Sequence, residues 1–134
     1  MLQTLPQSVP NQSNRQLILV VEDEAVSRRA LAMLLSYSGY AVKAVSSAEH
    51  ALEFLSHQSD PVIALVDFNL DGMDGLELIH RLREGGLCSA SILVTATGDE
   101  NIRELAQQKS IPFLRKPISL RQLLALVDTN ASGA

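Results

Sequence analysis

The stretch Val-Ile-Ala-Leu-Val-Asp at residues 62–67 is a short apolar run that ends in a carboxylate. Such a run is typical of a strand that is covered on both faces of a parallel sheet. Leu-Ile-Leu-Val-Val at residues 17–21 has the same character, and Glu22-Asp23-Glu24 follows it directly. Because open α/β sheets bind ligands just outside the carboxyl ends of their strands, we expect both acidic groups to lie at a binding edge.

Strand-like and helix-like patterns alternate five times along the chain. The predicted strands are Leu17–Val21, Ala41–Val45, Val62–Val66, Ser91–Thr95 and Ile111–Leu114. Alternation of this kind with short connections predicts an α/β fold, in which right-handed crossovers place helices on both faces of a parallel sheet.

A helix is predicted after each strand. The first contains apolar residues at helical spacing, namely Val26, Ala30, Met33, Leu34 and Tyr37. Ser46 followed by Glu49 indicates a capping box before a helix at about residues 48–56. Asp74 and Ser119 are predicted to cap two further helices in the same way. The helix predicted at about residues 99–108 has few apolar residues, so we expect it to be weakly packed and comparatively mobile.

The chain of 134 residues is long enough for one domain with a sizeable core. Residues 1–15 are rich in Gln, Ser, Asn and Pro, and they are expected to form a disordered arm or a linker. Residues 16–128 are expected to form the domain, and residues 129–134 a frayed C-terminal tail.

Composition argues against several classes of function. The net charge of −4 is unfavourable for direct nucleic-acid binding, and no apolar run is long enough for insertion into a membrane. Cys88 is the only cysteine, which excludes an internal disulfide and fits a reducing, cytoplasmic location.

Three carboxylates are predicted to converge if the first and third strands are neighbours in the sheet. These are Glu22, Asp23 and Asp67. Their mutual repulsion costs free energy unless a divalent cation joins them, and Mg²⁺ prefers oxygen ligands of this kind. A second interpretation is that Glu22 and Glu24 cap the following helix, where negative charge is favoured.

Lys116 and Thr95 are predicted at the same edge of the sheet. Lys116 follows the fifth strand, where its ammonium group could reach the carboxylates or an incoming phosphoryl oxygen. Thr95 ends the fourth strand and offers a hydroxyl donor. Pro117 restricts the backbone of Lys116, although the sequence does not specify whether the bond between them is cis or trans. Together these residues indicate that Asp67 is built to receive a phosphoryl group.

Four motifs occur in order, each after the expected strand: Leu-Val-Val-Glu-Asp-Glu (19–24), Leu-Val-Asp-Phe-Asn-Leu (65–70) with Met-Asp-Gly-Leu-Glu (73–77), Val-Thr-Ala (94–96) and Phe-Leu-Arg-Lys-Pro (113–117). On these motifs the chain resembles the receiver domain of bacterial two-component response regulators over about residues 16–127. Some stretches are similar to receivers of hybrid sensor histidine kinases. The resemblance implies a flavodoxin-like (βα)5 fold, with five parallel strands in the order 2-1-3-4-5.

The resemblance also implies a phosphorelay function. Asp67 would take a phosphoryl group from a histidine kinase or a histidine phosphotransfer protein. Mg²⁺ would be bound by Glu22, Asp23, Asp67 and the backbone carbonyl of Asn69. Such a domain promotes only its own phosphorylation and dephosphorylation, so it is not expected to be a turnover enzyme.

Further residues match family positions that respond to the phosphoryl group. Lys116 and Thr95 would contact it, and Phe113 would move inward as the switch aromatic when Thr95 shifts. Asn69 and Thr97 match positions that tune the rate of dephosphorylation. The fourth helix, fifth strand and fifth helix would form the partner surface, and a homodimer through that surface is one expected assembly.

One residue departs from the family pattern. Asp71 stands where the family often has proline, and we expect it to add a carboxylate near the site and a more flexible loop.

Three other functions remain as alternatives. A haloacid-dehalogenase-like hydrolase or phosphotransferase would need an acidic residue two positions after its nucleophile, and Asn69 stands there. A phosphorylation-independent binding module would have no need of the Asp67, Lys116 and Thr95 set. Flavin binding is disfavoured, because acidic residues occupy the edge that a flavin phosphate would need.

Overall fold

The computed structural model describes residues 16–96 and 100–132. Within them the strands are β1 (Leu17–Val21), β2 (Ala41–Val45), β3 (Val62–Asp67), β4 (Ala90–Thr95) and β5 (Phe113–Arg115). The helices are α2 (Ala25–Tyr37), α3 (Ala48–Ser56), α4 (Gly75–Glu84), α5 (Glu100–Gln108) and α6 (Leu120–Ser132).

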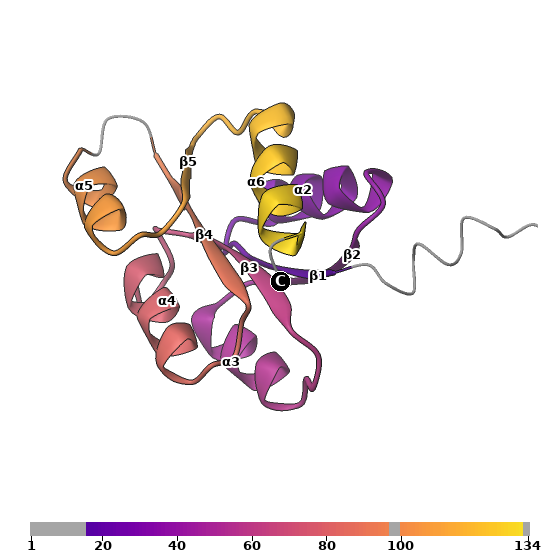
Figure 1. Ribbon diagram of the computed structural model, residues 1–134, viewed down its shortest axis with the longest axis horizontal. Helices are drawn as coiled ribbons and strands as arrows, with labels where there is room; N and C mark the ends of the chain where they lie inside the picture. The colour runs from indigo at the N-terminus through magenta and orange to yellow at the C-terminus, as the bar shows by residue number, and fades with distance from the viewer. Residues whose placement is uncertain (1–15, 97–99, 133–134) are drawn as a thin grey trace, which may run out of the picture.

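The strands form one parallel sheet in the order β2-β1-β3-β4-β5, as the resemblance implied. β1 and β3 run side by side, with Val21 opposite Val66. Both strands are almost wholly buried, because helices cover the sheet on its two faces. The ends of β1 and β3 are therefore held in register at one edge of the sheet (Figure 1).

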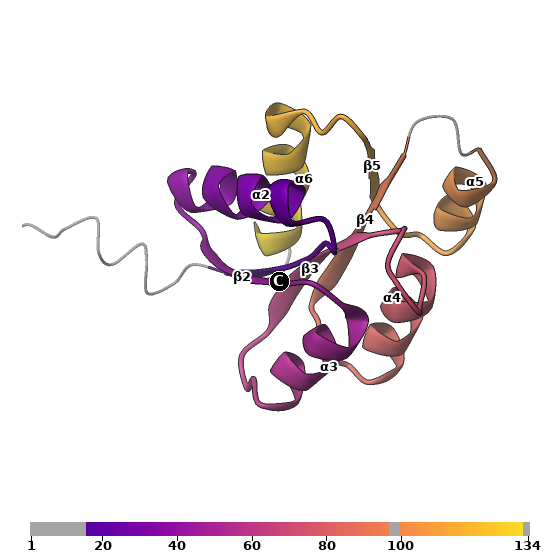
Figure 2. The same ribbon diagram turned by 180° about the vertical axis from the view of Figure 1, so that it is seen from behind.

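The helices divide into two layers. α2 and α6 pack on one face of the sheet, and α3, α4 and α5 pack on the other, as the view from behind also shows (Figure 2). Alternate residues along each strand pack into the cores on the two faces of the sheet. Ile18 and Val20 join the α2 and α6 layer, whereas Leu19 and Val21 join the other one. The sheet is thus the rigid scaffold that carries the loops at its carboxyl edge.

The first four predicted strands agree with the observed ones to within one residue, and the last one differs more. β5 was expected at residues 111–114 but is shorter and begins at Phe113. Ser110 has a positive φ of 57°, so the chain is still turning as it leaves α5. The Ile111 amide donates back to the Ala106 carbonyl, and Pro112 has no amide hydrogen to donate to the ladder.

Two of the three predicted helix caps are correct. Asp74 accepts a hydrogen bond from the Glu77 amide at 2.8 Å, and Ser119 accepts one from the Gln122 amide at 3.3 Å. The capping box at Ser46 was wrong. Ser47 caps α3 instead, because its hydroxyl accepts from the His50 amide at 3.1 Å.

The apolar residues that predicted the first helix do not face the core. α2 buries Leu31 and Leu35 against the sheet, whereas Val26, Met33 and Tyr37 are 69%, 56% and 83% exposed. The helix is therefore apolar on two opposite sides, so its sequence pattern indicated a helix without indicating its orientation.

α5 is the helix with the least burial, as its sequence predicted. Ala106 is its only buried residue, and Leu105 is 39% exposed. At the C-terminus, α6 continues to Ser132, so residues 129–132, which were expected in a tail, are helical. None of the helices in the described part of the chain is long and apolar enough to cross a membrane.

Candidate functional site

The site lies at the carboxyl ends of the two central strands. Asp67 is the last residue of β3, and Glu22 follows β1 directly. The Glu22 amide donates to the Val45 carbonyl at 3.1 Å, which continues the ladder one step beyond β1. Both acidic side chains are therefore placed by sheet hydrogen bonding rather than by a free loop.

The carboxylates of Glu22, Asp23 and Asp67 come together as predicted. One oxygen of each lies within 4.8 Å of the others. Glu22 is only 2% exposed and Asp67 4% exposed, whereas Asp23 is half-buried. Three carboxylates at this separation repel one another strongly in a desolvated setting, so the arrangement favours a bound cation.

Asp67 Oδ1 is buried and has no hydrogen-bond partner among the described residues. A buried carboxylate oxygen without a partner is costly, since it has lost its hydration and gained nothing in exchange. Its position beside two other carboxylates fits the oxygen donor set that a hard divalent cation prefers. The residues present therefore fit a Mg²⁺ site.

Lys116 is the cation that the chain itself supplies to the cluster. Its Nζ lies 3.3 Å from Glu22 Oε1 and 3.4 Å from Asp67 Oδ2. Burial lowers the pKa of Lys116, but the charges of Asp67 and Glu22 outweigh that effect, and the net direction is upward. The ammonium group is therefore firmly protonated, as the prediction for this residue required.

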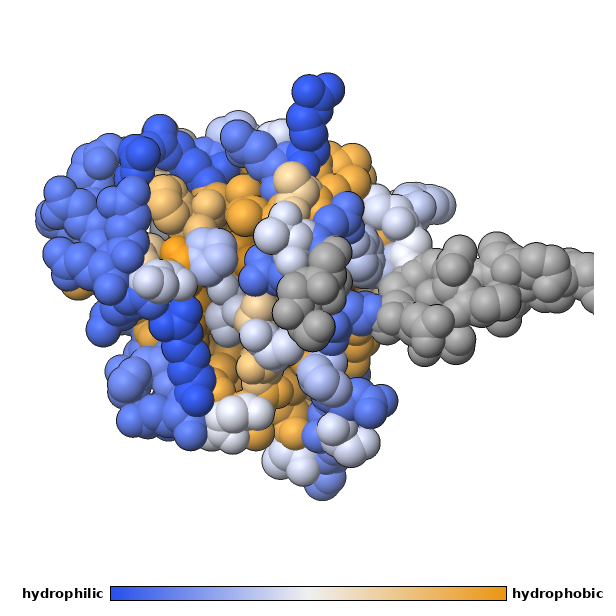
Figure 3. All heavy atoms as spheres, viewed as in Figure 1, coloured by the Kyte–Doolittle hydropathy of each residue, from blue (hydrophilic) through white to orange (hydrophobic). Residues whose placement is uncertain are grey.

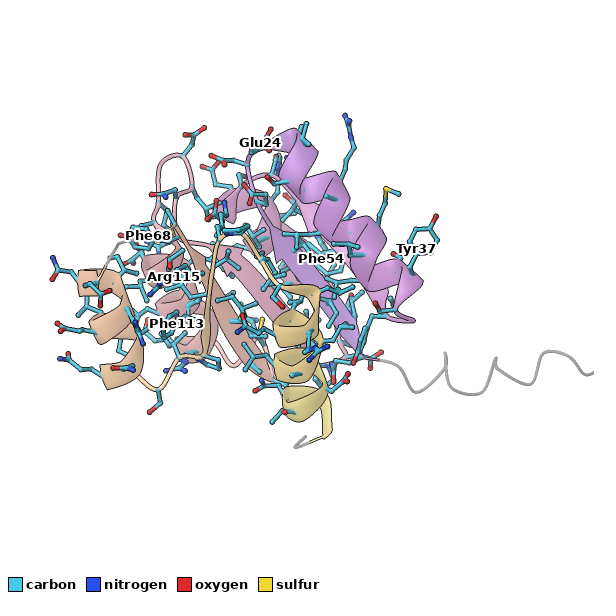
Figure 4. All side chains as sticks on the ribbon, turned by 90° about the horizontal axis from the view of Figure 1, so that it is seen from above. Glu24, Tyr37, Phe54, Phe68, Phe113 and Arg115 are labelled. Carbon is cyan, nitrogen blue, oxygen red and sulfur yellow. The ribbon has the colours of Figure 1, made fainter. Side chains whose placement is uncertain are left out.

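Burial and the neighbouring Asp67 charge raise the pKa of Glu22 above its ordinary value, while a hydrogen bond from the Glu24 amide and the charge of Lys116 oppose the rise. Glu24 itself lies outside the cluster. It caps α2 by accepting from the Ser27 amide at 2.8 Å, which lowers its pKa. For Glu24 the capping interpretation is thus confirmed (Figure 4).

Thr95 ends β4, next to β3 in the sheet, and it is buried. Asp67 is opposite Val94 in this pairing, so Thr95 lies one step further along the same edge. The Thr95 carbonyl accepts from the Lys116 amide at 2.8 Å, which connects the two residues through the backbone. The peptide bond between Lys116 and Pro117 is cis.

Sequence reasoning missed two residues that hold the site. Gly75 begins α4, where an added Cβ would lie 2.5 Å from the Asp67 carbonyl oxygen, so only glycine allows the helix to approach β3 this closely. Arg28 donates from one guanidinium nitrogen to the carbonyls of Glu22 at 3.0 Å and Asp23 at 3.3 Å. The glycine in the 73–77 motif was the signal for Gly75, whereas nothing in the spacing of Arg28 indicated its role.

Phe113 lies at the side of the site, on β5. It is half-buried and packs against the α3, α4 and α5 core, on the same side of the molecule as Phe68 (Figure 4). The guanidinium carbon of Arg103, on α5, lies 5.5 Å from the centroid of the Phe113 ring, within the range of a cation–π contact.

A cavity of about 700 Å³ opens between α5 and α6 over β5, and Phe113, Lys116 and Leu126 are among the residues that line it. Figure 3 shows apolar surface in this region beside the hydrophilic outer side of α5. Because Lys116 both lines this cavity and contacts Asp67, the cavity and the carboxylate cluster share a wall.

The remaining predicted positions lie around the loop after β3. Asn69 is exposed in that loop. Asp71 lines a separate cavity of about 130 Å³ with Glu49, and it is not one of the three clustered carboxylates in the described part of the chain. Thr97 lies outside the described residues.

The family model for the response regulator receiver domain matches residues 18–128. The chain is 36% identical over 113 residues to the two-component response regulator PhoP of Pseudomonas aeruginosa, covering 83% of this chain and 49% of PhoP. It is 34% identical over 115 residues to a cyclic di-GMP phosphodiesterase of Thermotoga maritima, covering 85% of this chain and 30% of that protein. The chain thus spans at most about half the length of these relatives.

Solved structures agree with the family match. A response regulator receiver protein from Pseudomonas putida is 31% identical to this chain, with a TM-score of 0.77 over 86% of this chain and 97% of that one. The match of the family model, the strand order and the position of the acidic cluster point to one conclusion. The chain belongs to the response regulator receiver domain family, the phosphoacceptor domains of two-component signalling.

Proposed function

We propose that Asp67 is the residue that accepts the phosphoryl group. The observation that carries this proposal is the buried Asp67 carboxylate, which contacts Lys116 through Oδ2 and keeps Oδ1 without a partner among the described residues. A carboxylate used only for structure would have both oxygens satisfied. One oxygen is thus held in place while the other stays available as a nucleophile or a metal ligand.

Glu22, Asp23 and Asp67, with the backbone carbonyl of Asn69, would hold Mg²⁺. The convergence of the three carboxylates supports this assignment. When bound, the ion would offset negative charge on the transferring phosphoryl group. Lys116 would add a second positive charge from the opposite wall, at a position already within 3.4 Å of Asp67.

The transfer is a displacement at phosphorus. An Asp67 oxygen attacks the phosphorus atom of a phosphohistidine, and a new O–P bond forms as the P–N bond breaks. The electron pair of the broken bond stays on the imidazole nitrogen of the donor. Lys116 and the Thr95 hydroxyl would then contact oxygens of the aspartyl phosphate, which carries more charge than the carboxylate it replaces.

The response to phosphorylation would pass through β5. The Thr95 carbonyl is hydrogen-bonded to the Lys116 amide, so a shift of Thr95 towards the phosphoryl group would move the start of the loop that follows β5. Phe113 would then turn inward and leave its contact with Arg103. The surface made by α5, β5 and α6, with its cavity of about 700 Å³, would change shape and present the signal to a partner.

The phosphoryl donor would be a histidine kinase or a histidine phosphotransfer protein, and the domain would act in the cytoplasm, as its free cysteine thiol favours.

The domain would not turn over a substrate. The name phosphodiesterase belongs to a relative of which this chain spans 30%. Residues 1–15, which lie outside the described residues, would serve as an arm or a linker. Asn69 and Thr97 would tune the phosphoryl lifetime, and a homodimer through α5, β5 and α6 stays a prediction.

The direct test is the mass of the intact protein after incubation with phosphoramidate and Mg²⁺. Phosphoramidate carries a P–N bond, as phosphohistidine does. Wild-type protein should gain one phosphoryl group, Asp67→Asn should gain none, and Asp71→Asn should behave as wild type, because Asp71 lies outside the cluster. A gain in Asp67→Asn equal to that of the wild type would disprove the assignment.

A further inference from the structure

A cavity of about 520 Å³ lies at the edge of the sheet that β2 forms. Residues of α2, of the end of β2 and of α3 line it, among them Arg28, Lys43, Ser46, His50 and Phe54. None of the residues that line it belongs to the carboxylate cluster or to the cavity over β5. Its volume is within the range of sites that bind small molecules.

Arg28 is fixed at the wall of this cavity by the backbone of the loop after β1. Its Nη1 donates to the carbonyls of Glu22 at 3.0 Å and Asp23 at 3.3 Å. Among the described residues, no acceptor pairs with the Nε or Nη2 donors of Arg28. A guanidinium group stays charged at all physiological pH values, and its fork of donors matches the oxygen atoms of a phosphate group.

Lys43 is held at the same cavity by an aromatic ring. Its Nζ lies 5.5 Å from the centroid of the Phe54 ring, within the range of a cation–π contact. The contact joins β2 to α3 and restrains an ammonium group that would otherwise move freely in solvent. Two positive charges are thus positioned before any ligand arrives, which reduces the entropy that binding has to remove.

Ser46 and His50 add hydrogen-bonding groups to the lining. Ser46 Oγ lies 3.4 Å from His50 Nδ1, and both a hydroxyl and an imidazole can donate to an anion. Glu53 is the acidic residue in the lining, but its side chain is 75% exposed and its carboxylate lies 3.8 Å from His57 Nε2. Basic groups therefore outnumber acidic ones at this cavity, in a chain whose net charge is −4.

We propose that this cavity binds a small organic phosphate. Two positioned cations, a hydroxyl and an imidazole suit a dianion with three terminal oxygens better than they suit a single carboxylate. Ala44, Val45 and Phe54 form the apolar part of the lining. They favour a ligand that carries an apolar group beside its phosphate over inorganic phosphate alone.

The proposal does not depend on the phosphorylation of Asp67. Arg28 contacts the backbone of Glu22 and Asp23, but none of the three clustered carboxylates lines the cavity. In metal-free protein the cluster has three carboxylates against the one ammonium group of Lys116, so it repels the anion that the cavity attracts. Binding can therefore be measured without Mg²⁺ and without a phosphoryl donor.

Phenyl phosphate is the probe, and the amide chemical shifts of isotope-labelled protein in EDTA report where it binds. We expect saturable shifts at residues 43–50, with a dissociation constant of about 1 mM or lower. Inorganic phosphate should bind at the same residues at least about threefold more weakly, because it has no apolar group to bury.

A matched pair of lysine substitutions tests the lining. Lys43→Gln should raise the dissociation constant for phenyl phosphate at least about fivefold, because it removes a charged donor from the cavity. Lys109→Gln removes the same charge from an exposed position outside the cavity, so binding should stay as in the wild type. Both lysines are exposed, so amide spectra away from each substitution should match the wild-type spectrum.

Three results would overturn the proposal. Equal weakening by the two substitutions would mean that overall charge attracts the anion. Shifts confined to the surroundings of Thr95 and Lys116 would place it at the phosphoacceptor site instead. The third is the absence of any saturable shift up to about 10 mM phenyl phosphate. None of these results bears on the phosphoramidate test of Asp67.

Discussion

Lys116 determines the electrostatic balance of the carboxylate cluster. Glu22 and Asp67 are almost fully buried, and the Lys116 ammonium lies within 3.4 Å of both. Lys116 Nζ donates to Asp67 Oδ2, while no described residue forms a hydrogen bond with Asp67 Oδ1. Removal of the Lys116 ammonium would leave the two buried carboxylates without a neighbouring positive charge, and this loss lowers the free energy of unfolding.

We expect Lys116→Met to destabilise the cation-free protein by about 1–3 kcal/mol, less than for a fully buried pair because the Lys116 side chain is 35% exposed. Urea unfolding in the presence of EDTA measures the change. Lys109→Met serves as the control, since Lys109 is exposed and lies outside the cluster. Equal free energies of unfolding for the two variants would show that the ion pairs contribute nothing.

Residue types at the site were predictable because each carries its chemistry in its side chain. The acidic pair follows β1, Asp67 ends β3 and Lys116 follows β5, so all of them lie at the carboxyl ends of parallel strands, where open α/β sheets bind ligands. Arg28 and Gly75 were not predicted. Arg28 acts on backbone carbonyls, and Gly75 acts through the side chain it lacks, so neither leaves a recognisable polar pattern.

At the scale of elements, the start of α4 fixes the geometry of the site. The Gly75 amide donates to the Phe68 carbonyl at 2.8 Å, and Asp74 caps the helix, so α4 begins directly against the end of β3. The contact is with backbone atoms of Asp67 and Phe68, which cannot move aside as a flexible side chain can. The helix and the phosphoacceptor are therefore coupled through close packing.

Gly75→Ala should destabilise the protein by about 2–3 kcal/mol, because the new methyl group would overlap the Asp67 carbonyl. Gly85→Ala is the matched control, since its Cβ would meet the side chain of Leu87 at 3.1 Å, which can adjust. Thermal or urea unfolding of both variants gives the comparison. A change in Gly75→Ala no larger than that in Gly85→Ala would mean that the close approach is not required.

The N-terminal cap of α3 can also be tested by substitution. Ser47→Ala should cost about 1 kcal/mol, because the His50 amide loses its acceptor at the helix N-terminus. Ser46→Ala should change stability by less than about 0.5 kcal/mol, since its hydroxyl contacts only the exposed His50 ring at 3.4 Å. The reverse order in urea unfolding would restore Ser46 as the cap.

Element boundaries show where sequence patterns carry too little information. Two adjacent serines precede α3, and the choice between them depends on the backbone angles that the preceding strand imposes. Similarly, α2 has apolar residues on two sides, so the pattern predicts its existence but not which side meets the sheet. The strands β1, β3 and β4 are almost wholly buried, and they were easier to predict because a short apolar run has few other stable uses.

For the molecule as a whole, we predict that cation binding and folding are linked. The carboxylates converge only in the folded sheet, so Mg²⁺ should stabilise the native state by about 2.7 kcal/mol at a concentration a hundred times its dissociation constant. The thermal midpoint of the wild type should rise with Mg²⁺ and fall again with EDTA. Asp67→Asn should lose most of the rise, whereas Asp71→Asn should keep it. No rise in the wild type would contradict a Mg²⁺ site.

We predict that one carboxylate, Asp67, receives the phosphoryl group. Borohydride reduces an aspartyl phosphate to homoserine, so reduction after treatment with phosphoramidate and Mg²⁺ marks the modified residue for peptide mass spectrometry. We predict homoserine at position 67, in the peptide that carries the end of β3. Homoserine at Asp23 or Asp71 with Asp67 intact would contradict this assignment, as would a phosphoryl group that resists reduction and maps to a serine or threonine.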